Sequence, residues 1–279
     1  MYHQGIISLV YIMKRFNPYV KSLIALIFIF IVSFLYFEMK SNEDFIPDNK
    51  KAIIPLESAP DLEIDEPRFP VPDITFDKIQ RPDLVALPAL NQSDQYLHLA
   101  LSQIMDEGIS KLLSQTTLIE KIVATIDNLP RKYVAERLRP LAAIENSFIV
   151  ERQADTSDFI LSTESYDRYA FLVDQLSEIG ANNLADIYLR FYPLFQEVYE
   201  DLGYPKAYFN DRMIDVIDHL LLTPEVNDPI ILRRPHVLYE FIHPELEALS
   251  SGQKLLIRLG TRNSAKVKQF LIELKASIS

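Results

Sequence analysis

The pattern of apolar and polar positions divides the chain into three parts. Residues 22–37 form a run without a charged residue, and residues 38–92 are rich in proline and charge. From residue 93 onward, apolar residues recur at three- and four-residue spacing, which is typical of amphipathic helices. This last part is long enough for a sizeable core, so we predict a mainly α protein with a single helical domain over residues 93–279.

Helix-capping residues indicate where several of these helices begin. Ser93 and Asn210 stand before amphipathic stretches as N-cap residues. Thr117-Leu-Ile-Glu120 and Ser250-Ser-Gly-Gln253 match the capping box, in which two side chains satisfy free N–H groups of the first turn. The helix after Ser250 is expected to break near Gly260. Further helices are predicted over residues 163–179, 182–202 and 263–278.

The predicted helix over residues 182–202 is apolar on two sides. One stripe consists of Leu184, Ile187, Phe191, Leu194 and Val198. The other consists of Tyr188, Tyr192, Phe195 and Tyr199. A helix with two apolar faces is usually buried, so we place this one at the centre of the domain. We expect Pro193 to bend it and Gly203 to cap its end.

Short apolar stretches elsewhere in the domain favour strands. They predict one or two short β-hairpins, over residues 148–152, 159–161, 230–233 and 237–241.

The uncharged run predicts a transmembrane helix over residues 21–37. Lys14, Arg15 and Lys21 lie before or at its start, whereas acidic residues follow it: Glu38, Glu43, Asp44 and Asp48. This asymmetry orients a short segment, residues 1–20, to the cytoplasm and the rest of the chain to the other side. The alternative, a cleaved signal peptide, requires small residues after the run, which instead ends in Phe-Leu-Tyr-Phe-Glu. Met13 is a second possible start of translation.

Residues 38–92 are predicted to form an acidic, proline-rich linker. Eight of the 17 prolines fall there, with 12 acidic residues against six basic ones. Proline disfavours helix and central strand, and charge keeps such a segment in water. We interpret it as a spacer, and the alternative is a proline-rich docking segment.

Composition narrows the possible chemistry. The chain has no cysteine, which rules out disulfides, thiolate metal sites and a cysteine nucleophile. Its formal net charge of −11 argues against nucleic acid as a partner. No phosphate-binding glycine loop, nucleophile elbow or zincin histidine pair occurs. We therefore assign no catalytic residue, no metal ligand and no cofactor.

One acidic cluster is the strongest candidate for a functional site. Asp211, Asp215, Asp218 and His219 share one face of the helix that follows Asn210. Such a face could bind a divalent cation, or act as acid and base. It could equally be a solvated face, or pair with internal arginines. We expect internal compensation, with Arg258 or Arg168 as the partner.

A second candidate is basic. Lys254, Arg258, Arg262 and Lys266 are four residues apart and form a stripe if the helix continues through Gly260. The stripe either packs on residues 163–228, which contain 13 acidic and four basic residues, or binds an anionic polymer, lipid headgroups or an acidic partner. Five tyrosines within residues 188–208 favour core packing over a glycan- or peptide-binding groove.

A series of short signatures in fixed order resembles a known family. They are Ile122-Val-Ala-Thr-Ile-Asp-Asn-Leu-Pro-Arg131, Arg168-Tyr169, Tyr192-Pro-Leu194 with Tyr199-Glu-Asp-Leu-Gly-Tyr204, Phe209-Asn-Asp-Arg212 with Ile217-Asp-His-Leu-Leu221, and Gly252-Gln-Lys254 with Arg258-Leu-Gly260. Over about residues 88–275 the chain resembles the domain-of-unknown-function 3014 family of proteobacterial envelope proteins. The resemblance implies an anchored, envelope-located domain, and it transfers no catalytic residue. Combined with the predicted orientation of the anchor, this predicts a single-pass protein of the bacterial inner membrane with its C-terminal domain in the periplasm.

These observations favour a non-catalytic cell-envelope interaction module, whose partner is an envelope protein or polymer. The alternative is an envelope hydrolase that uses carboxylates of the helix over residues 211–219. A third reading is a structural part of a larger membrane complex.

The predicted topology can be tested with fusions to the full anchor. Alkaline phosphatase fused after residue 92 should be active, because it folds only outside the cytoplasm. A fluorescent protein fused at the same place and exported unfolded should be dark. The reverse pair of results would contradict the predicted orientation.

Overall fold

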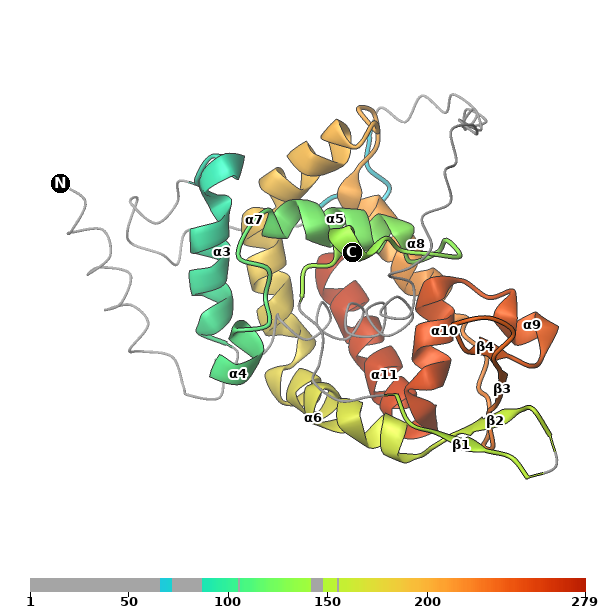
Figure 1. Cartoon of the computed structure of the whole chain (residues 1–279). Coiled ribbons are helices and arrows are strands. Elements are labelled where there is room, and N and C mark those ends of the chain that lie inside the picture. The colour runs from blue at the N-terminus through green and yellow to red at the C-terminus, as the bar shows by residue number, and fades with distance from the viewer. Residues whose placement is uncertain (1–65, 72–86, 105, 142–147, 155) are drawn as a thin grey trace.

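The computed structural model describes residues 66–71, 87–104, 106–141, 148–154 and 156–279 (Figure 1). Among these residues no helix is both long and apolar enough to cross a bilayer. The predicted membrane helix over residues 21–37, the segment before it and most of the predicted linker lie outside the described residues, so those predictions stay open.

Helix α7 (Ala181–Asp201) lies at the centre of the helical core. Helices α5 (Leu118–Asn128), α8 (Phe209–Leu221) and α11 (Gly260–Ile278) all pack against it (Figure 1). Both of its apolar stripes are buried, including Phe191 and Leu194 on one and Tyr188 and Phe195 on the other. The predicted central helix is thus confirmed. Pro193 lies within it, and Gly203 follows its end with a φ of 106°, a conformation that favours glycine.

The remaining helices complete the bundle around α7. The turn η4 (Leu90–Gln92) leads into α3 (Ser93–Ser102), which packs on α5 and on the short α4 (Glu107–Ser110). Helix α6 (Glu164–Ile179) packs along α11, and α10 (Ser251–Arg258) contacts both α8 and α11. The turn η5 (Glu136–Leu138) and the short α9 (Pro244–Glu247) lie in the connections.

The four strands form one antiparallel sheet in the order β1-β2-β3-β4. They are β1 (Val150–Arg152), β2 (Phe159–Leu161), β3 (Ile231–Arg233) and β4 (Glu240–Phe241). Both predicted hairpins exist, and pairing of β2 with β3 joins them. Three residues of this sheet, Leu161, Leu232 and Phe241, are buried together with Ile257 of α10. They belong to a second, smaller apolar cluster. Burying these apolar residues together favours one sheet over two exposed hairpins.

Of the predicted caps, the one at Ser250 is confirmed and the one at Thr117 is wrong. Ser250 and Gln253 form both hydrogen bonds of the capping box at the start of α10. Thr117 instead has a left-handed backbone, with φ of 52°, and its side chain caps nothing. The carboxylate of Asp94 accepts the N–H groups of Thr117 and Leu118, both at 2.8 Å. Asp94, which is distant in sequence, therefore caps α5 in place of Thr117.

Ser93 and Asn210 are also not caps. Helix α3 follows η4 directly, so Ser93 is its first residue and is buried, with Gln92 at the N-cap position. Asn210 is the second residue of α8, and Tyr208 precedes that helix as its N-cap. The predicted break at Gly260 is confirmed: α10 ends at Arg258, and Gly260 has a φ of 77° and opens α11. A Cβ at Gly260 would lie 2.8 Å from the ring of Tyr166.

The buried position of Phe191 predicts a large loss of stability when it is truncated. Phe191 is 2% exposed, so Phe191→Ala should lower the free energy of unfolding by about 3–5 kcal/mol through lost transfer energy and a new cavity. Urea titration followed by far-UV circular dichroism measures the change. Phe171→Ala on α6 is the matched control, because Phe171 is 56% exposed. Equal losses in the two variants would contradict a central α7.

Candidate functional site

The acidic residues predicted to share a face of α8 do not converge on one point. The opposite face of α8 is apolar and buried through Ile214, Ile217 and Leu220. On the polar side, Asp211 and Asp215 both bind Arg68, whereas Asp218 binds Lys275.

Asp211 binds the backbone of a segment far away in sequence. Its side chain accepts the N–H of Arg68 at 3.0 Å through Oδ2 and the N–H of Phe69 at 2.9 Å through Oδ1. Asp211 is 6% exposed and lies in the first turn of α8, where the helix dipole favours a negative charge. Both carboxylate oxygens are thus engaged in binding main chain.

Asp215, one turn further along, binds the side chain of the same segment. The guanidinium Nη2 of Arg68 donates to Asp215 Oδ2 at 2.6 Å. This hydrogen bond, together with the two nearby carboxylates, raises the pKa of Arg68 above its ordinary value. Both side chains are about half exposed, so the pair contributes on the order of 0–1 kcal/mol to stability.

Asp218 is compensated from the C-terminal helix. Lys275 Nζ of α11 lies 2.5 Å from Oδ1 and 2.7 Å from Oδ2 of Asp218. Internal compensation of the acidic face is therefore confirmed, but its cations are Arg68 and Lys275. The expectation that Arg258 or Arg168 would serve was wrong, because both residues lie beside aromatic rings near the sheet.

His219 forms a close pair with Ser250 that resembles a nucleophile and its base. His219 Nε2 is 2.8 Å from Ser250 Oγ. The same oxygen accepts the N–H of Gln253 at 3.2 Å, and the tautomer of the imidazole decides whether His219 or Ser250 donates in the hydrogen bond between them. Burial, and then the positive charge of Arg212, lower the pKa of His219. Because Ser250 is buried and caps α10, the geometry assigns the pair to holding α8 against α10.

The described residues offer no group of three or more histidine and acidic side chains placed to hold a metal ion. Since Asp211 and Asp215 are engaged with Arg68 and Asp218 with Lys275, the arrangement gives no support to a hydrolase built on these carboxylates. The acidic face of α8 has the chemistry of a binding surface.

Segment 66–71 lies against this face and extends the site (Figure 1). Asn210 donates from Nδ2 to the carbonyl of Phe69 at 2.9 Å and to the carbonyl of Ile278 at 2.8 Å. The Oδ1 of Asn210 accepts the hydroxyl of Tyr188 at 3.0 Å. Phe69 packs against the main core. These six residues of the predicted linker therefore contact the domain.

The predicted basic stripe is not a continuous surface. Lys254 and Arg258 are only 3% and 2% exposed. Lys254 binds Glu247 at 2.7 Å, and Arg258 donates to the carbonyl of Tyr239 at 2.9 Å with its guanidinium over the ring of Phe241. Lys254 thus ties α10 to α9, and Arg258 ties it to the start of β4, so neither residue contributes to the alternative cationic surface.

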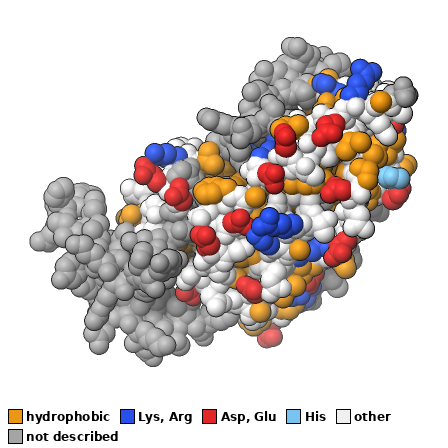
Figure 2. Space-filling view, turned by 90° about the horizontal axis from the view of Figure 1, so that it is seen from below, with side chains coloured by type: hydrophobic (Ala, Val, Ile, Leu, Met, Phe, Trp, Pro, Cys, Tyr) orange, Lys and Arg blue, Asp and Glu red, His pale blue; other side chains and the backbone are white. Residues whose placement is uncertain are grey.

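The other two members of the stripe lie on α11, beyond the break at Gly260. Arg262 is exposed, and Lys266 pairs with Asp174 of α6. This pair agrees with the expectation that the stripe packs on the acidic middle of the chain. On the face shown in Figure 2, acidic and basic side chains are interspersed.

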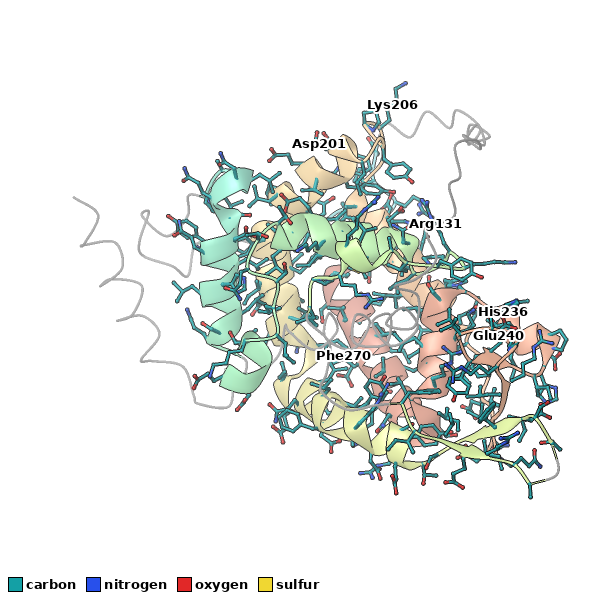
Figure 3. All side chains as sticks on the ribbon, viewed as in Figure 1. Arg131, Asp201, Lys206, His236, Glu240 and Phe270 are labelled. Atoms are coloured by element: carbon teal, nitrogen blue, oxygen red, sulfur yellow. The ribbon has the colours of Figure 1, made fainter. Side chains whose placement is uncertain are left out.

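Sequence reasoning missed a cluster formed by three of the family signatures. Asp127 of α5 is buried and binds Arg212 Nε at 2.9 Å and Arg131 Nη2 at 3.0 Å. Arg131 lies past the end of α5, at the edge of the domain (Figure 3). Tyr199 and Tyr204 stack with ring centroids 4.7 Å apart, and burial raises the pKa of Tyr199 to about 12. The signal available in the sequence was that all five residues stand within the signatures of the family.

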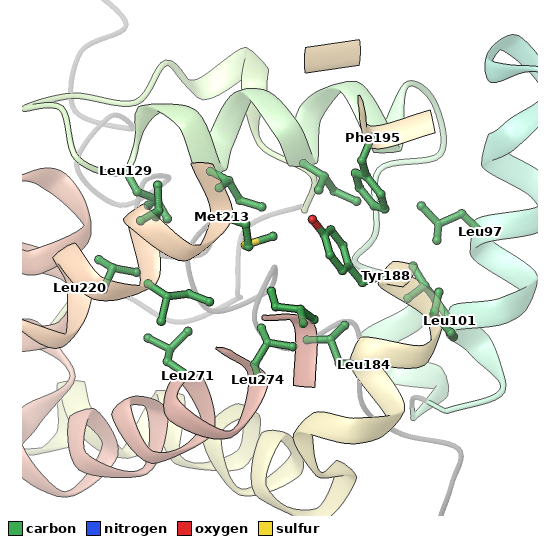
Figure 4. Close-up of a pocket in the computed structure, with 16 residues that line it drawn as sticks. Leu97, Leu101, Leu129, Leu184, Tyr188, Phe195, Met213, Leu220, Leu271 and Leu274 are labelled. Carbon is green, nitrogen blue, oxygen red and sulfur yellow. The ribbon is translucent and has the colours of Figure 1, made fainter. Parts of the chain in front are cut away.

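A small cavity inside the bundle is too small to be a ligand site. Its volume is ≈ 50 Å³, and apolar side chains of α3, α5, α7, α8 and α11 line it, among them Leu97, Leu184 and Met213 (Figure 4). Ligand pockets usually measure about 300–1,000 Å³. The space is a packing gap of the kind that stays dry.

Comparison with known families gives one match. The family model described as "Protein of unknown function (DUF3014)" matches residues 118–275. No curated protein and no solved structure matches the chain. The matched range runs from α5 into α11 and includes Asn210, Asp211 and Asp215, but not segment 66–71.

The lowered pKa of His219 predicts a pH dependence of stability. The pKa of an unfolded histidine is about 6.5. The pKa of folded His219 is lower, so its side chain stays neutral to lower pH. The unfolded state therefore binds more protons as the pH falls through the unfolded pKa, and stability is lost there. Urea unfolding of the unchanged protein and of His219→Gln, from pH 8 to pH 5, should show the smaller loss in the variant. His236→Gln, at an exposed histidine, is the control; identical curves for all three proteins would refute the prediction.

Proposed function

The chain belongs to the DUF3014 family, and we propose that it is a single-pass inner-membrane protein whose helical domain is a non-catalytic interaction module in the periplasm. The uncharged run at residues 22–37, with bases before it and acids after it, supports the membrane anchor and its orientation.

One observation carries the proposal of an interaction module. The polar start of α8 binds an extended segment of chain through its main chain, with two N–H groups donating to Asp211 and one carbonyl accepting from Asn210. Main-chain hydrogen bonds combined with a seated side chain are a general mode of peptide recognition. A catalytic carboxylate, by contrast, must be within reach of a substrate proton.

The partner class follows from charge and compartment. A net charge of −11 disfavours nucleic acid. An envelope protein or polymer remains as the partner of a domain tethered on the outer side of the inner membrane. The tether supplies proximity to the membrane, and the domain supplies recognition.

Cross-linking in intact cells tests this function. The tagged full chain should capture a partner that is absent when residues 1–92 carry an unrelated periplasmic domain. The capture should survive Asp218→Asn, a change on the same helix away from segment 66–71, because no catalysis is involved. Equal capture by the chain and the control fusion would refute an interaction module.

A further inference from the structure

Segment 66–71 is held as an extended peptide with two distinct sides. Its odd-numbered residues are partly buried and its even-numbered residues are exposed, which is the alternation of an extended chain. Phe69 points to the core, where it packs against the main apolar cluster. Arg68 points outward to Asp215 and places its guanidinium 5.7 Å from the ring centre of Phe69.

The groups that hold the segment are fixed by contacts of their own. Asn210 is fully buried, and its amide is oriented by the hydroxyl of Tyr188 and the carbonyl of Ile278. An amide nitrogen has two hydrogens, so one remains for the carbonyl of Phe69. Asp211 and Asp215 project from successive turns of α8. The receptor side is thus preorganised, which lowers the cost of binding.

We propose that this surface, formed by Asn210, Asp211 and Asp215, is a peptide-binding site for an extended partner segment carrying arginine followed by an aromatic residue, and that segment 66–71 occupies it as an internal competitor. The inference rests on the proposed function, because it names the site at which the module meets its partner. In this site, Asp211 and Asn210 form hydrogen bonds with the main chain of the peptide, and Asp215 forms an ion pair with its arginine. The aromatic ring packs against the edge of the apolar core.

The internal segment is a weak ligand held by its covalent connection. Its polar contacts include three main-chain hydrogen bonds and two ion pairs of the half-exposed Arg68, with Asp211 at 3.6 Å and with Asp215 at 2.6 Å. Residues 72–86 connect it to the domain, and a connection of such length gives an effective concentration on the order of millimolar. A free peptide must compete with this concentration, so removing the internal segment should strengthen apparent binding by on the order of tenfold.

Binding of a fluorescein-labelled peptide with the sequence of residues 64–73 to the purified full chain tests the proposal. The double variant Arg68→Ala, Phe69→Ala weakens the internal segment, and fluorescence anisotropy should show about tenfold tighter binding to it than to the unchanged chain. Arg152→Ala, Phe171→Ala is the matched control, because it makes the same substitutions at exposed positions elsewhere. That control should bind the peptide as the unchanged chain does.

A charge exchange separates recognition from folding. Added to the double variant, Asp215→Arg should weaken binding of the arginine peptide and strengthen binding of the same peptide with arginine replaced by glutamate. Asp215 is exposed, so the fold should tolerate the change, and thermal unfolding checks this. Asp211→Ala should abolish binding of both peptides.

Three results would overturn the inference: no binding of the peptide to the double variant, equal binding to the double variant and the unchanged chain, or no response to Asp215→Arg. A dimer that disappears with Asp211→Ala would also overturn it, since the second occupant would then be another copy of this chain. The proposed function has a separate readout, because the cross-linking comparison does not depend on the peptide.

Discussion

A helix that is apolar on two sides has to be enclosed, and the burial of α7 fixes the arrangement of the domain. Covering both stripes takes α5, α8 and α11 together. Because α8 packs on the core through Ile214 and Ile217, its opposite, polar face has to point away from the core. The position of Asn210, Asp211 and Asp215 is therefore a consequence of how the core closes around α7, and the site inherits the rigidity of that core.

Polar groups at the ends of elements are satisfied by residues distant in sequence. Asp94 caps α5, Asp211 accepts two N–H groups of segment 66–71, and Lys275 compensates Asp218. Buried or partly buried polar groups need such partners, because leaving one unpaired costs about 1–3 kcal/mol. In this domain the same requirement that stabilises the fold also determines where an extended segment can bind.

Local patterns were sufficient where the physical cause is local. The double stripe of α7, the capping box at Ser250 and the break at Gly260 each follow from residues within a few positions of one another. Thr117 and Asn210 have the chemistry of caps, yet their surroundings depend on Asp94 and on segment 66–71, which no local window contains. The arrangement of the candidate site was unpredictable for this reason, although Asp211 and Asp215 themselves were identified.

Charge spacing misled in a related way. Lys254 and Arg258 are one turn apart, as an exposed stripe requires, but a lysine with a carboxylate and an arginine with a carbonyl and an aromatic face can both be buried. Spacing specifies which side of a helix a residue occupies and says nothing about what covers that side. Burial places Lys254 against Glu247 of α9 and Arg258 against Tyr239 and Phe241.

The side-chain amide of Asn210 donates hydrogen bonds both to Phe69, near the N-terminal end of the described domain, and to Ile278, in the last turn of α11. A pulling force that enters the chain from the side of residue 66 is consequently transmitted to α8 and α11 first. The contact thus joins the N-terminal side of the described domain to its last helix by a path that does not run through α3 or α5.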